Sequence, residues 1–202
     1  SNAIHIHYAE SLETIGENLK EVQPYCFTTV PRLLEKVYEK IMEKGHQLEG
    51  FKKKLFFWAV KLGLQFELNK NMGWWYNLQL SIARKLIFSK WQEALGGEVE
   101  FIVTGAAAFQ PRLAKLFTAA GISIIEGYGL TETSPVLSVN RLEIENRAIG
   151  TVGMPIPGVE IKLAADGEIL AKGPNIMRGY YKRQDLTDEV IDSDGWFHTG
   201  DI

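Results

Sequence analysis

The sequence predicts an α/β protein, and three features of the chain support this prediction. Up to Gly97, apolar residues recur at spacings of three and four, as they do on the buried faces of helices. Two short apolar runs at residues 99–103 and 122–125 then enclose a helical pattern at residues 111–120. From about Ser134 onward, glycine, proline and alternating apolar residues predominate, which is typical of antiparallel strands and turns.

The first half of the chain is expected to be mostly helical. A short strand is expected to open it at Ile4, and residues 27–30 should form an extended segment between the first two helices. Proline at the start and glycine at the end mark helix boundaries, so we place the second helix between Pro31 and Gly45. The four expected helices are residues 12–22, residues 31–45, residues 51–66 and a segment from residue 78 to the Gly96–Gly97 pair.

Two strand units follow. The strand at residues 99–103, the helix closed by Gly121 and the strand at residues 122–125 form a β-α-β unit, whose two strands are expected to be parallel. Further on, residues 159–163 alternate between apolar and charged side chains, and Asp166-Gly167 provides a turn into a partner strand at residues 168–172. This second pattern predicts an antiparallel hairpin.

The composition excludes several classes of protein. Among the 202 residues, 22 Lys and Arg against 25 Asp and Glu leave a net charge of −3, which excludes a nucleic-acid binder that works by bulk positive charge. The single cysteine, Cys26, excludes an internal disulfide framework, and we expect it to be a buried filler. The longest apolar run, residues 55–60, is too short to span a bilayer. A cytoplasmic protein is expected.

The most informative stretch for chemistry is residues 126–133, where the second strand of the β-α-β unit ends. Ligands of open α/β sheets bind at the carboxyl ends of parallel strands. Here two glycines allow close approach of a ligand, and Tyr128 between them offers an aromatic face. Thr131 offers a hydroxyl for a phosphate, and Glu132 offers a hard oxygen for Mg²⁺. On composition alone, a glycine turn followed by a helix cap explains the stretch equally well.

Four separate blocks carry a resemblance to a known family. Residues 128–135, Tyr-Gly-Leu-Thr-Glu-Thr-Ser-Pro, resemble the core signature of the adenylate-forming acyl-CoA synthetases, the AMP-binding enzyme family. Residues 104–107, 150–155 and 195–201 resemble three further motifs of that family, in the family's order. The segment at residues 30–37 and the helical insertion after it resemble the branch that acts on long-chain fatty acids.

The resemblance implies a fold and a division of the chain. It implies a fragment of the large N-terminal domain of an acyl-CoA synthetase-like fold. Residues 4–133 would form its α/β portion with parallel strands and a helical insertion, and residues 134–202 would form part of an antiparallel β-barrel. Residues 1–3, Ser-Asn-Ala, are typical of the remnant of a cleaved tag.

The resemblance also implies roles for individual residues. Thr131 and Glu132 would be catalytic, with Thr131 on a phosphate and Glu132 holding magnesium. Asp201 would bind the ribose hydroxyls, because a carboxylate accepts two diol protons well. Glu126 stands where related sequences often place an amide. The residues implied to contact the nucleotide or the acyl-adenylate are Gly105, Ala106, Glu126, Gly127, Tyr128, Thr131 and Asp201.

The activity implied by the resemblance has two steps. ATP, with Mg²⁺, would activate a long-chain fatty acid to acyl-AMP, and coenzyme A would then displace AMP to give acyl-CoA. The partners would thus be small molecules, namely fatty acid, ATP and coenzyme A, with no nucleic acid. The family's phosphate loop is expected before Ile4 and its C-terminal domain after Ile202, so this portion is expected to be inactive alone.

Two alternatives and several weaker features stay open. The enzyme could activate another acid, aromatic or an amino acid, or the chain could be a non-catalytic nucleotide-binding module of the same fold. The basic run at residues 52–54 and the apolar residues 55–58 could make a weak peripheral contact with an anionic membrane. His5 and His7 alternate as two metal ligands could, although a solvated strand face explains them as well. His198 is expected to hydrogen-bond to backbone.

Overall fold

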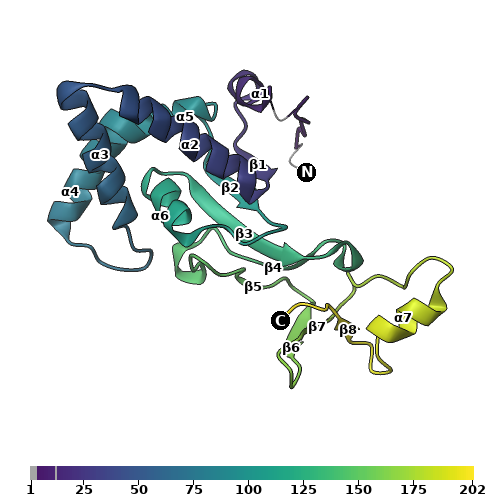
Figure 1. Ribbon diagram of the computed structural model, residues 1–202. Coiled ribbons are helices and arrows are strands. Elements are labelled where there is room, and N and C mark those ends of the chain that lie inside the picture. The colour runs from purple at the N-terminus through teal and green to yellow at the C-terminus, as the bar shows by residue number, and fades with distance from the viewer. Residues whose placement is uncertain (1–3, 12) are drawn as a thin grey trace. The chain divides into compact units, whose positions relative to one another are not determined.

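The computed structural model describes residues 4–11 and 13–202, without the side chain of Ile144 (Figure 1). The expected tag remnant at residues 1–3 and Leu12 of the first helix lie outside the described residues. The chain divides into two compact units, one up to Ile125 and one from Glu126 to Ile202. They are called unit 1 and unit 2.

Unit 1 is mostly helical, as the periodicity predicted. Pro31 begins its second helix with a backbone nitrogen that needs no hydrogen-bond partner there. The expected fourth helix is one helical stretch whose middle widens into a π-helical turn, η1. The elements are α1 (Ile15–Val22), α2 (Pro31–Gln47), α3 (Gly50–Leu64), α4 (Trp74–Ala83), η1 (Arg84–Phe88), α5 (Ser89–Ala94) and α6 (Pro111–Ala119).

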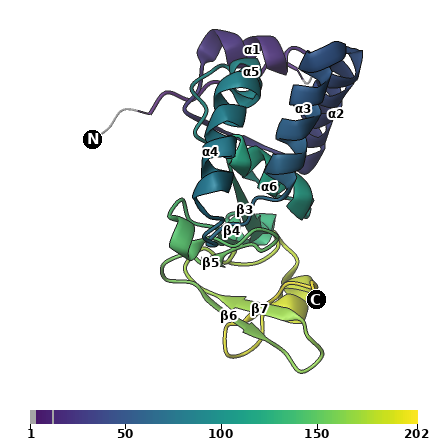
Figure 2. The same ribbon diagram turned by 90° about the vertical axis from the view of Figure 1, so that its left-hand side faces the viewer.

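Two expectations about unit 1 are wrong. Residues 4–9 form no strand, because no described segment pairs with them, and Ile4 and Ile6 are exposed. Gly45 does not end α2, which continues to Gln47. The role of this glycine is in packing: a Cβ at residue 45 would overlap the ring of Phe56, so glycine lets α3 come close to α2. Figure 2 shows the two helices side by side.

The strands of unit 1 lie next to one another in the order β1-β2-β3. β1 (Cys26–Thr29) pairs in parallel with β2 (Phe101–Thr104), and Cys26 stands opposite Phe101. After α6, the chain returns as β3 (Ser123–Gly129), whose first residues belong to unit 1 and whose last belong to unit 2. Cys26 is exposed, so its assignment as buried filler is wrong: the side chains of the outer strand β1 alternate between exposed and half-buried.

The core of unit 1 lies between helices and strands. Phe117 and Leu116 of α6, Ile102 of β2 and Phe88 are fully buried. Gly63 of α3 faces the same region, where a Cβ would overlap a methyl group of Leu116. The close packing of α3 against α6 therefore depends on a residue without a side chain.

Unit 2 consists of short antiparallel strands and turns. The end of β3 pairs with β4 (Val136–Val139), and β4 pairs with β5 (Met154–Pro155). The predicted hairpin is confirmed as β6 (Glu160–Leu163) and β7 (Ile169–Lys172), to which β8 (Phe197–His198) adds a third strand. A small cluster of Leu137, Val159 and Ala171 forms its core. The remaining elements are α7 (Gln184–Val190) and the 3₁₀ turns Thr131–Thr133 and Ile144–Asn146.

Candidate functional site

The loop after β3 is shaped by two backbone features. The register of β3 against β4 shifts between Tyr128 and Gly129, and Ser134 adopts a left-handed conformation with φ of 55°. Between them, Thr131–Thr133 form a single 3₁₀ turn. A Cβ on Gly129 would overlap the carbonyl oxygen of Pro135, so the chain folds back closely onto this glycine. The second glycine of the motif is thus required for the turn itself.

Buried hydrogen bonds hold this loop in place. The Thr133 side chain is fully buried, and its hydroxyl accepts the Leu130 N–H (2.9 Å) and lies 2.6 Å from the Pro135 carbonyl oxygen, to which it donates. Asn175 Nδ2 donates to the carbonyl oxygens of Thr133 (2.8 Å) and Val136 (2.9 Å). No pattern in the sequence pointed to Asn175, which lies in an irregular segment after β7.

The two predicted catalytic residues occupy the accessible side of this turn. Thr131 is exposed, and Glu132 is half-buried. The hydroxyl of Tyr180 donates a hydrogen bond to Glu132 Oε1 (3.0 Å), and this bond raises the pKa of Tyr180. The backbone carbonyl of Glu132 also accepts the Met177 N–H (2.7 Å). Tyr180 therefore orients the Glu132 carboxylate, and Met177 holds the backbone of the same residue.

The donor set near Glu132 fits one kind of cation. Among the described residues, no three His, Cys, Asp or Glu side chains gather as a metal-binding group. Mg²⁺ in nucleotide enzymes is commonly held by only one or two carboxylates, with phosphate oxygens and waters as the other ligands. Tyr180 bonds to Oε1 of Glu132, so the second carboxylate oxygen can bind a cation. A single carboxylate suits Mg²⁺ that is shared with phosphates and water, and it does not suit a metal ion that is held by protein ligands alone.

Tyr128 and Asp201 come together although 73 positions separate them. The Tyr128 hydroxyl donates to Asp201 Oδ2 at 2.6 Å. Partial burial and this hydrogen bond to a carboxylate raise the pKa of Tyr128 to about 12. The phenol therefore stays a neutral donor over the whole physiological range, and it fixes the ring of one predicted nucleotide contact against the carboxylate of another.

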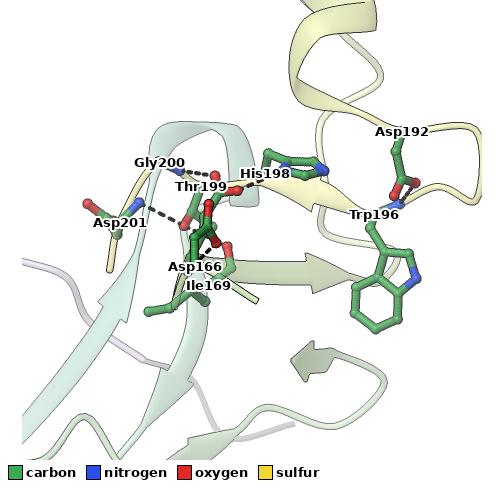
Figure 3. A network of polar contacts seen from close by, with 9 residues as sticks. Asp166, Ile169, Asp192, Trp196, His198, Thr199, Gly200 and Asp201 are labelled. Atoms are coloured by element: carbon green, nitrogen blue, oxygen red, sulfur yellow. Dashed lines mark hydrogen bonds and ion pairs between the residues drawn. The ribbon is translucent and has the colours of Figure 1, made fainter. Parts of the chain in front are cut away.

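Glu168 takes part in a network of polar contacts with the segment that carries Asp201, and Figure 3 shows His198, Gly200 and Asp201 of this network. Glu168 Oε1 accepts the Gly200 N–H (2.8 Å), and its Oε2 lies 2.8 Å from Nδ1 of His198. The Ile169 N–H donates to the carbonyl oxygen of Asp201 (2.9 Å). In Figure 3, the Asp201 side chain points away from this network. Glu168 thus holds the His198 side chain and the Gly200 backbone, one on each side of Thr199, and the Asp201 side chain stays exposed.

The expectation for His198 is corrected by this network. Its ring bonds to the Glu168 carboxylate, where a backbone partner was expected. The reason is the pairing of β7 with β8, which places residue 198 beside Leu170 and so within reach of the carboxylate at the start of β7. Glu168 itself had a weak signal in the sequence, as the first residue after the Asp166-Gly167 turn.

Glu126 and Gly127 lie within β3, before the loop. The Glu126 side chain is buried, and Oε1 accepts the Gly150 N–H (3.4 Å). Its backbone carbonyl accepts the Asn140 N–H (2.9 Å). Gly127 pairs with Val139 in the sheet. Glu126 therefore connects the strand to the glycine-rich turn at residues 150–153, which is another of the recognised motifs.

Gly105 and Ala106 belong to unit 1, whereas the other predicted contacts belong to unit 2. They follow the end of β2, and Ala106 adopts a left-handed conformation with φ of 67°, which is uncommon for a residue with a side chain. With Pro31, Arg32 and Glu35 they line a cavity of about 270 Å³. The cavity joins two recognised motifs, residues 30–37 and residues 104–107, within one unit.

The weaker features of the sequence find no common site. His5 and His7 are exposed in the irregular opening segment. None of the described helices combines the length and apolar character needed to cross a bilayer.

Comparison with known proteins identifies relatives over nearly the whole chain. Residues 4–181 match the family described as AMP-binding enzyme. Long chain acyl-CoA synthetase 3 of Arabidopsis thaliana is 37% identical, over 92% of this chain and 29% of that protein. Long-chain-fatty-acid–CoA ligase 6 of Rattus norvegicus is 37% identical, over 95% of this chain and 28% of that protein. The chain thus spans less than a third of the length of these two curated relatives.

Solved structures share the fold at lower identity. A malonyl-CoA ligase, crystallised with methylmalonyl-CoA and AMP, superposes with a TM-score of 0.57 at 24% identity, covering 94% of this chain and 33% of that one. The o-succinylbenzoate CoA synthetase of Bacillus subtilis, in complex with its acyl-adenylate, gives a TM-score of 0.58 at 18% identity, covering 94% of this chain and 30% of that one. These likenesses confirm the predicted α/β fold.

Proposed function

Because the chain belongs to the AMP-binding enzyme family, we propose that it forms part of the nucleotide site of a long-chain fatty acid–CoA ligase. The choice of acid is supported by relatives of 37% identity that are named for long-chain fatty acids. The activity is that of the complete polypeptide that carries this sequence, since the matched relatives are about three times longer.

The contact between Tyr128 and Asp201 is the observation that carries this proposal. The Tyr128 ring would lie against adenine, because an aromatic face stacks on a purine. Asp201 would accept hydrogen bonds from the ribose hydroxyls. A carboxylate offers about four acceptor positions, so the bond from Tyr128 at 2.6 Å leaves room for both hydroxyls. A single hydrogen bond then sets the spacing between the base contact and the sugar contact.

Thr131 and Glu132 would serve the phosphates. The exposed Thr131 hydroxyl can donate to a phosphate oxygen, and Glu132, oriented by Tyr180, would hold Mg²⁺. Bound magnesium offsets the negative charge of the triphosphate. The rigid turn between Gly129 and Ser134, anchored by Thr133 and Asn175, would keep these two groups in place.

The chemistry that these residues support is the attack of one anion on another. The carboxylate of the fatty acid forms a bond to the α-phosphorus of ATP, and the bond to pyrophosphate breaks. The thiol of coenzyme A then forms a thioester at the acyl carbon, and AMP leaves. Protein groups contribute mainly alignment and charge compensation to such transfers. In unit 1, Gly105 and Ala106 would border the acyl-adenylate.

The direct test is fatty-acid-dependent exchange of pyrophosphate into ATP, assayed with the complete polypeptide. Glu132→Gln should lower the exchange rate about 100-fold, because the amide no longer holds the cation. The same variant should bind AMP normally, since AMP lacks the β- and γ-phosphates. Glu189→Gln, an exposed position on α7, is the matched control and should keep the parental rate. An unchanged exchange rate in Glu132→Gln would show that Glu132 is not the magnesium ligand.

The same assay separates the two alternatives. Strong exchange with benzoate or an amino acid, and none with hexadecanoate, would overturn the fatty-acid assignment. Binding of AMP without exchange for any acid would indicate a non-catalytic nucleotide-binding module. Asp201→Asn should weaken AMP binding by about tenfold in either case, because the amide is a poorer acceptor for the diol.

A further inference from the structure

Unit 1 contains a second and larger cavity, which none of the predicted nucleotide contacts lines. It has a volume of about 530 Å³, within the usual size range of small-molecule sites. Side chains from α2, α3, η1 and α5 form its walls, and most of them are apolar. The aromatic residues Phe56 and Trp91, which are 6% and 3% exposed, lie deepest.

The shape of the cavity depends on the packing of Gly45 against Phe56. A Cβ at residue 45 would overlap the Phe56 ring, so glycine gives this ring its place at the wall. Leu86, which is 48% exposed, also lines the cavity. The lining therefore combines buried rings with an apolar side chain that solvent reaches.

Three lysines line the same cavity: Lys44 from the last turn of α2, Lys52 from the start of α3 and Lys90 from α5. No carboxylate is among the described residues that line the cavity. Within the described chain, none of the three lysines has an acidic side chain within ion-pair distance. The chain as a whole carries a net charge of −3, so this local excess of positive charge runs against the composition.

We propose that this cavity binds a single-chain anionic amphiphile, with its alkyl chain on Phe56 and Trp91 and its anionic group among Lys44, Lys52 and Lys90. An alkyl chain gains free energy from leaving water for an apolar cavity. Exposed lysines are well suited to hold a carboxylate or phosphate at the rim without its desolvation. The basic-apolar sequence at residues 52–58 contributes Lys52, Leu55 and Phe56 to this one site. The inference goes beyond the proposed function, because it involves no ATP and no residue of the nucleotide motifs.

The occupancy of the cavity is measurable through Trp91. The probe is 9,10-dibromostearate, titrated as a monomer into the 202-residue chain, because bromine quenches indole fluorescence only at contact. Saturable quenching is expected, and Trp91→Phe should abolish the saturable part. Shorter carboxylates should compete about tenfold more weakly for each two methylenes removed. Absence of saturable quenching, or its persistence in Trp91→Phe, would overturn the proposal.

The charge at the rim is tested by a matched pair of triple variants. Replacing Lys44, Lys52 and Lys90 by Gln should weaken binding of the probe about tenfold, and salt should reduce this difference. Lys20, Lys36 and Lys85 are exposed and do not line the cavity. Replacing these three by Gln should leave binding of the probe within about twofold of the parental value. Equal losses in both triple variants would contradict the proposed contact. Dibromostearyl alcohol should bind both variants equally and weakly.

A filling variant and vesicles complete the test. Ala94→Phe adds a bulky side chain at an exposed position that lines the cavity, and it should weaken binding of the probe without removing charge. Phosphatidylcholine vesicles with and without phosphatidylserine distinguish a cavity ligand from a membrane surface. Sedimentation with anionic vesicles, together with no quenching by the monomeric probe, would assign the lysines to a membrane contact and overturn the cavity site.

Discussion

Unit 1 and unit 2 are held together by different kinds of interaction. Most buried apolar side chains of the described chain lie in unit 1, and those of unit 2 are Leu137, Val159, Leu170, Ala171 and Phe197. Unit 2 instead uses side chains that bond to backbone: Thr133 and Asn175 hold the loop after β3, and Glu168 holds the segment before Asp201. The predicted nucleotide contacts are concentrated in unit 2.

This difference has a physical consequence. Apolar packing tolerates substitutions of similar volume, but it sets the position of a polar group only indirectly. A hydrogen bond to backbone has a narrow geometry, so it fixes where a neighbouring carboxylate or hydroxyl lies. Core substitutions in unit 1 should therefore cost the most stability, whereas substitutions in unit 2 should cost less stability and more function.

The strongest test of the comparison is Phe117→Ala in unit 1. Phe117 is fully buried, and its ring lies 5.9 Å from that of Trp91, so its truncation should lower the free energy of unfolding by about 3–5 kcal/mol. Phe51→Ala, at a residue that is 77% exposed, should change it by less than about 0.5 kcal/mol. Urea unfolding followed by circular dichroism measures both. Similar values for the two variants would mean that unit 1 is not held by its core.

Gly129→Ala tests the loop of unit 2 with a smaller expected effect. The new Cβ would overlap the Pro135 carbonyl oxygen, so the turn must open, at a cost of about 2–3 kcal/mol. Gly127→Ala is the control. A Cβ at residue 127 would lie 3.4 Å from its nearest neighbour, the Ser138 carbonyl oxygen, which is an ordinary contact distance. Hydrogen exchange should become faster in residues 126–202 for Gly129→Ala only. Faster exchange confined to unit 1 would contradict the assignment.

Thr133→Val isolates the buried hydroxyl. Valine keeps the shape and leaves the Leu130 N–H without its partner, which should destabilise unit 2 by about 1–2 kcal/mol. Thr131→Val, at the exposed residue two positions earlier, should stay within about 0.5 kcal/mol. Chemical unfolding of the two variants side by side gives the comparison. A larger loss in Thr131→Val would reverse the roles given to the two threonines.

The smallest expected effect is on the pH dependence of stability, through Tyr128. The pKa of Tyr128 is raised to about 12 in the folded chain against about 10 when unfolded, so the folded state binds the phenol proton more tightly. The stability from this group is complete below pH 10 and is lost as the pH rises toward 12. The difference in ultraviolet absorbance between the parent and Tyr128→Phe should titrate near pH 12.

A further variant checks the cause of that shift. Asp201→Asn removes the carboxylate that accepts the Tyr128 proton while burial of the ring persists. The pKa of Tyr128 should then fall part of the way toward 10. A step that remains near pH 12 in Asp201→Asn would show that burial alone sets the pKa, and that the contact between the two side chains is not maintained in solution.

Local patterns in the sequence determined the helices, the hairpin at residues 160–172 and the family motifs. Helical periodicity, Pro31 and the Asp166-Gly167 turn act over a few residues, so they can be read without the fold. The glycine-rich stretch at residues 126–133 supplied Tyr128 and Glu132 as candidates, and the resemblance added Asp201. The same local reasoning failed at residues 4–9 and at Gly45, where the outcome depends on a distant partner: a pairing strand in one case and the Phe56 ring in the other.

Only the tertiary structure decided which side chains meet. Tyr128 with Asp201, Glu132 with Tyr180, and Glu168 with His198 are separated by 73, 48 and 30 positions, and no periodicity links them. No periodicity predicts either that Lys44, Lys52 and Lys90, which stand on three helices, line one cavity. The sequence alone determined which chemical groups are present and on which elements they stand. Their distances follow from strand pairing and helix packing, which are properties of the folded chain as a whole.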